Sequence, residues 1–178
     1  LEFRRVLFRS GIPTHTYGIG SDSPLMDGQC MSEGALRSML IGLSGADILG
    51  GAGQFEVATT ISPVQLAIDN EVFGMVRRML ANITFDDESL AWTDLLTAEP
   101  GGNFLTGDHT LRHCRDGLMP TNFTRMTRED WNKQGPGDLV ARAAQYCKDL
   151  LEKVTPANLP AQVTREMDAI VERADREL

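Results

Sequence analysis

The chain of 178 residues lacks the cysteine and membrane patterns that would fix its class directly. Its three cysteines, Cys30, Cys114 and Cys147, form no C-x-x-C pair, so the sequence indicates neither a cysteine-based zinc site nor a disulfide framework. Such sparse cysteine is typical of a reducing compartment, and we expect a cytoplasmic protein. No apolar run approaches the roughly 20 residues that span a bilayer, so we predict no membrane partner.

The signatures of common nucleotide and hydrolase sites are missing as well. The glycine-rich runs do not fit G-x-G-x-x-G and no P-loop lysine is present, which argues against a dinucleotide or nucleoside triphosphate site. Ser21 lacks the G-x-S-x-G context of a serine hydrolase. A familiar pair of nucleophile and base is therefore not evident in this sequence.

An excess of basic charge is also absent. The chain has 17 lysines and arginines against 25 acidic residues, which gives a formal net charge of −8 and a pI near 4.8. Because nucleic acid requires a basic surface, we predict no nucleic-acid partner. The acidic balance is compatible with a cationic substrate. A hydrophobic content of 42% is sufficient for a packed core.

Strand and helix patterns alternate along the first part of the chain. A strand is predicted at 11–17 and a short buried strand at 46–49, with a helix between them that Ser32 caps and Gly45 ends. Another helix starts at Ser62, with proline following the cap, and runs to about residue 81. We expect these side chains of the two helices to face inward: Met31, Ala35, Leu36, Met39, Leu40 and Leu43, then Val64, Ile68, Val72, Met75, Val76 and Met79. Asp69, Arg77 and Arg78 are expected to face outward.

Later segments continue the alternation. We predict a helix from Asp87, a short strand at 104–105 and a helical turn at 109–115, followed by helices around 139–151 and 163–171. The order β-α-β-α-α-β-α is typical of an α/β protein with a parallel sheet. A complete (β/α)8 barrel needs roughly 250 residues, so three strand–helix units fit the C-terminal part of such a barrel, followed by C-terminal helices.

Polar side chains follow each predicted strand, where a barrel places its substrate. We predict substrate contacts from Tyr17, Ser21, Asp22, Glu56 and His109. Aromatic rings and carboxylates suit a cation, which is held by ring faces and negative charge. The carboxylates could instead cap helices or close turns.

A metal site is not assigned, although two histidines have a suitable spacing. His109 and His113 share a helix face, but residue 110 is threonine, so H-E-x-x-H is not matched. Two alternatives remain open: a metal-dependent barrel hydrolase that uses His15, Asp22, His109 and His113, and a non-catalytic helical interaction module.

Three runs of the sequence together resemble one family of enzymes. The runs 11–22, 50–53 and 101–113 read GIPTHTYGIGSD, GGAG and GGNFLTGDHTLRH, and they are similar to the trimethylamine methyltransferase family. The resemblance implies a (β/α)8 barrel that passes a methyl group from a small methylated amine to the Co(I) corrinoid (cobalamin) of a partner protein. It also implies no bound cofactor in the chain itself, and it leaves a homo-oligomer open.

The resemblance also bears on the methyl donor. The trimethylamine enzymes carry pyrrolysine in the region that corresponds to about 17–20, where this chain has the ordinary residues Tyr-Gly-Ile-Gly. The chain is therefore similar to members without pyrrolysine, such as glycine betaine methyltransferases. The donor then implied is a quaternary amine such as glycine betaine, carnitine or proline betaine.

The two ends of the chain suggest its organisation. The basic run 1–10, LEFRRVLFRS, differs from all that follows, and we interpret it as a translated sequencing adapter. We predict that 11–134 forms the C-terminal part of a methyltransferase barrel and that 135–178 forms a helical tail packed on it. Such a piece is expected to be inactive alone and to associate, because a partial barrel leaves sheet edges unpaired.

Overall fold

The computed structural model describes residues 10–81, 83–117, 120–135, 137–154 and 159–177. The interpretation of 1–10 as an adapter therefore lies almost entirely outside the described residues. The chain divides into two units, Leu1–Cys147 and Lys148–Leu178. No helix among the described residues is both long and apolar enough to cross a membrane.

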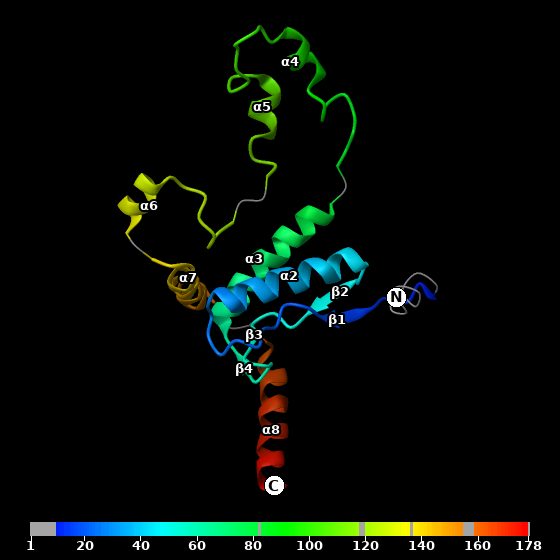
Figure 1. The fold of residues 1–178 in the computed structure, drawn as a ribbon. Helices are drawn as coiled ribbons and strands as arrows, with labels where there is room; N and C mark the ends of the chain where they lie inside the picture. The colour runs from blue at the N-terminus through cyan, green and yellow to red at the C-terminus, as the bar shows by residue number, and fades with distance from the viewer. Residues whose placement is uncertain (1–9, 82, 118–119, 136, 155–158, 178) are drawn as a thin grey trace. The chain divides into compact units, whose positions relative to one another are not determined.

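The first of these two units begins with a parallel β-α-β motif (Figure 1). Strand β1 (His15–Tyr17) pairs with β2 (Ile48–Gly50), with His15 opposite Ile48 and Tyr17 opposite Gly50. Helix α2 (Gly28–Ser44) connects them. Parallel strands need such a crossover, so the predicted order of strand, helix and strand is confirmed here.

The caps of the two long helices agree in part with the sequence pattern. Helix α2 ends at Gly45, whose φ of 84° is readily adopted by glycine. It begins earlier than expected, because Asp27 rather than Ser32 caps it by accepting from the Cys30 N–H at 3.0 Å. Helix α3 (Pro63–Leu80) starts as predicted, with the Ser62 hydroxyl accepting from two backbone N–H groups of the first turn.

The apolar stripe predicted for α2 is wrong as a core. Leu36, Leu40 and Leu43 are 59–67% exposed, whereas the residues of α2 that are buried are Cys30, Gly34 and Ser38. These small residues recur at every fourth position and form a narrow face of α2. This face lets the helix backbone approach the loop after β1 closely. A Cβ at Gly34 would lie only 2.9 Å from the carbonyl oxygen of Ile19.

Gly34→Ala is therefore expected to destabilise the chain by about 1 to 3 kcal/mol, the usual effect of overpacking, although alanine favours helix by about 1 kcal/mol. Gly28→Ala is the matched control, since a Cβ at Gly28 would meet nothing within 4 Å. Urea unfolding of both variants measures the difference. Equal stabilities for the two would contradict the close approach.

The core of the first unit lies largely on α3. Ile68, Val72 and Val76 are buried as predicted, but Met79 is 63% exposed. Asp69, expected on the outer surface, is 2% exposed. Its face of α3 is turned toward the loop after β2, where the carboxylate accepts from the backbone N–H of Gly53 at 2.7 Å. That hydrogen bond explains how a charged residue can be buried.

The remaining elements are short or helical. Strands β3 (Gln54–Phe55) and β4 (Thr60–Ile61) form an antiparallel pair that the sequence did not predict. The expected strand at 104–105 is absent, because Asn103 accepts from the Leu105 N–H and Gly107 donates to Phe104 in a turn. The expected helix from Asp87 starts later, as α4 (Trp92–Thr97). The others are α5 (Asp108–His113), α6 (Arg128–Gln134), α7 (Leu139–Lys153) and α8 (Ala161–Glu177). The described part is thus mixed α/β and mostly helical.

Candidate functional site

A pocket of about 460 Å³ lies where β1 and β2 end. Parallel strands bring their carboxyl ends to the same edge of a sheet, which is where α/β folds bind ligands. The pocket is lined by residues that follow both strands and by one from α2: Tyr17, Gly18, Gly20, Ser21, Asp22, Arg37, Gln54, Val57 and Ala58. We call it the rim pocket.

Tyr17 supplies the aromatic surface of the rim pocket. It is the last residue of β1, and 67% of it is exposed. A Cβ at Gly51 would lie 3.1 Å from the Tyr17 ring, so glycine leaves room for the ring beside the loop after β2. His15 meets the same ring edge-on, with 5.2 Å between ring centroids.

Ser21 and Asp22 are held by a single carboxylate of α2. Glu33 Oε2 accepts from the Ser21 hydroxyl at 2.8 Å and from the Asp22 N–H at 3.1 Å, while Gln29 donates to Oε1. The Ser21 hydrogen bond is the largest cause of a lowered pKa at Glu33. Glu33 is therefore a firm anion that fixes the loop after β1, and the Asp22 carboxylate is left exposed at the pocket.

Arg37 is the cation of the rim pocket, and the sequence pattern did not identify it. Its Nη1 donates to the Gly20 carbonyl at 2.6 Å. Its Nη2 lies 3.9 Å from the Asp22 carboxylate and 3.7 Å from that of Glu33. These two separations are ion-pair distances but exceed hydrogen-bond distances, so Nη2 keeps donors for a ligand.

A buried polar chain supports the loop after β2. The Cys30 thiol contacts Gln65 Oε1 at 3.6 Å, Gln65 Nε2 donates to Asp69 at 2.6 Å, and Asp69 accepts from Gly53. Burial raises the pKa of the Cys30 thiol, which makes it a poor nucleophile. Burial also raises the pKa of Asp69, from 3.8 to about 6. These groups position backbone and do not reach the pocket.

The five predicted site residues do not share one site. Tyr17, Ser21 and Asp22 line the rim pocket together. Glu56 lies on the same loop as Val57 and Ala58, but its carboxylate accepts from the Thr60 hydroxyl and does not line the pocket. His109 lines a different pocket, of about 780 Å³, with His113 and Glu88. The roles assigned to these residues remain predictions.

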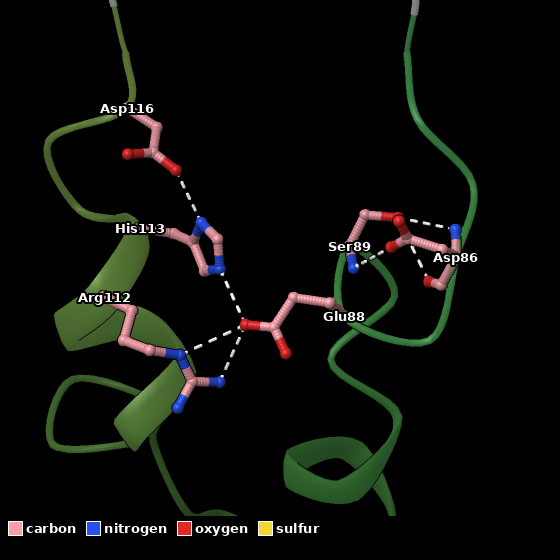
Figure 2. A network of polar contacts seen from close by, with 6 residues as sticks. All are labelled: Asp86, Glu88, Ser89, Arg112, His113 and Asp116. Atoms are coloured by element: carbon pink, nitrogen blue, oxygen red, sulfur yellow. Dashed lines mark hydrogen bonds and ion pairs between the residues drawn. The ribbon is translucent and has the colours of Figure 1, made fainter.

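That second pocket contains a dense polar cluster (Figure 2). Glu88 Oε1 is 2.8 Å from Arg112 Nη2 and 2.9 Å from His113 Nε2, and His113 Nδ1 is 2.5 Å from Asp116 Oδ2. The His113 hydrogen bond, followed by that of Arg112, lowers the pKa of Glu88. The same Glu88 contact, with that of Asp116, raises the pKa of His113.

Comparison with known proteins identifies the family. The sequence model described as trimethylamine methyltransferase (MTTB) matches residues 6–178. The chain belongs to the trimethylamine methyltransferase family. The resemblance of its three runs to that family is thereby confirmed.

The relatives of this chain include two kinds of methyltransferase. The trimethylamine methyltransferase MttB of Desulfitobacterium hafniense is 32% identical over 166 residues, which is 93% of this chain and 34% of the relative. The MttB of Methanosarcina barkeri has the same identity and coverage. A glycine betaine methyltransferase of Desulfitobacterium hafniense is 26% identical over 170 residues, 94% of this chain and 35% of the relative. The chain thus spans about a third of these relatives' length.

Family membership changes how the rim pocket is interpreted. Five of its lining residues, Tyr17, Gly18, Gly20, Ser21 and Asp22, come from the run 11–22 that carries the family resemblance. Arg37 and Glu33 come from the helix that follows, where their i, i+4 spacing of opposite charges was a usable signal. The second cluster draws His109 and His113 from the run 101–113, but Glu88 lies outside all three runs.

Proposed function

We propose that the chain forms part of an enzyme that moves a methyl group from a carboxylate-bearing quaternary amine, such as glycine betaine, to the Co(I) corrinoid of a partner protein. Carnitine and proline betaine belong to the same class of donor. The observation that carries the proposal is the arrangement of Tyr17, Asp22 and Arg37 around one pocket in a member of this family.

The pocket has groups for both ends of such a zwitterion. A quaternary ammonium ion has no N–H to donate and is attracted to ring faces and to anions, which Tyr17 and Asp22 supply. The carboxylate of the donor fits Arg37, whose Nη2 donors are uncommitted. Trimethylamine has no group that would use Arg37, which favours the quaternary donors.

The size and exposure of the pocket agree with a corrinoid that is carried by a partner protein. Its volume of about 460 Å³ lies in the range for sites of small ligands, and Tyr17 and Asp22 are exposed where a second protein could approach.

A Co(I) corrinoid supplies the nucleophile for the methyl group. The chain's own residues then hold the donor in line: Asp22 and Tyr17 bind the ammonium, and Arg37 binds the carboxylate. The methyl–nitrogen bond breaks, nitrogen keeps the electron pair, and the tertiary amine leaves.

The same proposal extends to the architecture. We propose that 11–134 belongs to the C-terminal part of a (β/α)8 barrel and that 135–178 packs on it as helices. The parallel pair of β1 and β2 around α2 supports one strand–helix unit of that barrel.

The test is methylation of free cob(I)alamin by the enzyme completed from its source DNA, with glycine betaine, carnitine, proline betaine and trimethylamine offered separately. A carboxylate-bearing quaternary amine is expected to be a donor and trimethylamine is not. Methylation by trimethylamine alone, or by no donor, would contradict the proposal.

Arg37→Gln in that enzyme is expected to lower kcat/KM for the zwitterionic donor by at least 10-fold, mainly through KM. A charge-assisted hydrogen bond contributes about 1.5 to 3 kcal/mol, and partial exposure of Arg37 places the effect toward the lower value. Arg173→Gln, an exposed arginine of α8, is the matched control. An unchanged KM in Arg37→Gln would remove the arginine from the proposed site.

A further inference from the structure

The segment 83–117 has little apolar core of its own. All of its residues are described, and helices α4 and α5 contain no buried residue. Ile83, Phe85 and Leu105 are each at least 76% exposed. A segment that buries so little apolar surface requires another source of stability, and in small motifs a structural metal ion often provides it.

Three ligand-type side chains converge in this segment. One ligand atom each of Glu88, His109 and His113 lies within 4.8 Å of the other two. Ligands at about 2.0 to 2.2 Å from a tetrahedral zinc ion lie about 3.3 to 3.6 Å apart, so the side chains would move inward by no more than about 1.5 Å. Two histidines and one glutamate are a known ligand set for zinc with an open fourth position.

The hydrogen bonds around these ligands favour a metal at the same point. His109 Nε2 is buried and has no hydrogen-bond partner, which is costly unless something else binds it. His113 Nδ1 contacts the Asp116 carboxylate, an arrangement that commonly orients a histidine whose other nitrogen binds a metal. His113 Nε2 faces Glu88 on that other side (Figure 2).

Glu88 keeps one oxygen for a cation. Its contacts with Arg112 and with His113 all involve Oε1, and in Figure 2 every dashed line to Glu88 ends on one oxygen. Arg112 weakens the attraction for a cation by its charge but also fixes the carboxylate. Arg78 and Asp86 also line the second pocket, so its three acidic residues, Asp86, Glu88 and Asp116, face two arginines.

We propose that Glu88, His109 and His113 bind one Zn²⁺ ion, with water in the fourth position, and that this ion fastens α5 to the turn 86–91. Asp116 is a positioning residue that orients His113. The zinc site shares no lining residue with the rim pocket. Its test is therefore independent of the identity of the methyl donor.

Zinc titration of the purified, chelator-treated full chain tests the proposal, with calorimetry and elemental analysis as readouts. One equivalent of zinc is expected to bind and to slow proteolysis within 83–117. His109→Ala and His113→Ala are expected to weaken binding more than 100-fold, and Asp116→Asn by about 10- to 100-fold. His15→Ala and Cys114→Ser are matched controls and should bind as the unmodified chain does.

Several outcomes would overturn the site. They are substoichiometric binding, equal affinity in the His109→Ala variant, or an equal loss in either control. Zinc binding that leaves proteolysis of 83–117 unchanged would overturn the fastening role. Because a variant could fail to fold, the Co²⁺-loaded unmodified chain gives a second readout: intense visible bands of four-coordinate cobalt support the site, and a pale six-coordinate spectrum opposes it.

Discussion

Replacing Glu71 by alanine is expected to lower the free energy of unfolding by about 3 kcal/mol. Glu71, on α3, accepts four hydrogen bonds, from the backbone N–H groups of Thr121, Asn122 and Phe123 and from the Asn122 side chain. Hydrogen bonds to a charged group contribute about 1.5 to 3 kcal/mol each. Partial exposure of these groups reduces that sum, because water satisfies some of the freed donors.

The effect should be local as well as global. Arg142 of α7 donates to the Asn122 carbonyl at 2.8 Å, so Glu71 binds the N–H groups of the segment 121–123 and Arg142 binds one of its carbonyls. In Glu71→Ala, amide hydrogen exchange at Thr121, Asn122 and Phe123 is expected to accelerate.

Two variants make the Glu71 measurement decisive. Glu71→Gln keeps an acceptor but loses the charge, so it should retain about half of the stabilisation. Asn70→Ala changes the exposed neighbour on the same helix and is expected to change stability by no more than about 0.5 kcal/mol. Unfolding in urea gives the energies, and unchanged exchange of the three amides in Glu71→Ala would contradict the anchoring role.

The parallel unit could be predicted because local rules decide it. The left-handed Gly45 that ends α2 and the short apolar strand predicted at 46–49 depend on residues adjacent in sequence, as does the Ser62 cap of the next helix, α3. The two-residue strands β3 and β4 have no such pattern, because a two-residue strand shows no measurable alternation.

Burial of helix faces was harder to predict. Periodicity identified an apolar face of α2 at Leu36, Leu40 and Leu43, yet the face that packs carries Gly34 and Ser38. A hydrophobic pattern indicates a face on which burial would be favourable. It does not indicate which neighbouring element, if any, covers that face. The recurrence of small residues at every fourth position was the sequence signal for close packing.

The candidate site was predictable where it follows a strand. Tyr17, Ser21 and Asp22 reach the rim pocket because β1 ends beside β2. The i, i+4 spacing of Glu33 and Arg37 indicated a charge pair on α2. Which other residues Arg37 and the proposed ligand Glu88 approach depends on tertiary contacts, which no local rule predicts. His109 was expected with the residues of the rim, and the turn at 103–107 that replaces the third strand accounts for its different neighbours.

The buried carboxylate of Asp69 is expected to make stability fall as the pH rises from about 4 to about 6.5. Because burial raises the pKa of Asp69 in the folded chain from 3.8 to about 6, the folded state binds the proton more tightly than the unfolded state does. The stabilisation from protonation is complete below about pH 4 and is lost as the pH passes the folded-state pKa. A difference of about two pKa units corresponds to about 3 kcal/mol.

Other carboxylates also titrate in this range, so the informative quantity is a difference between variants. Asp69→Asn cannot ionise, and the stability of the unmodified chain minus that of Asp69→Asn should decrease by about 3 kcal/mol between pH 4 and pH 7.5. Any fixed cost of placing an amide opposite Gln65 shifts this difference equally at every pH. Asp168→Asn, which replaces an exposed carboxylate of α8, is the matched control, and an equal decrease in that variant would contradict the role of burial at Asp69. A flat difference for Asp69→Asn would mean that the pKa of Asp69 is the same in the folded and the unfolded chain, because the hydrogen bonds from Gly53 and Gln65 offset its loss of hydration.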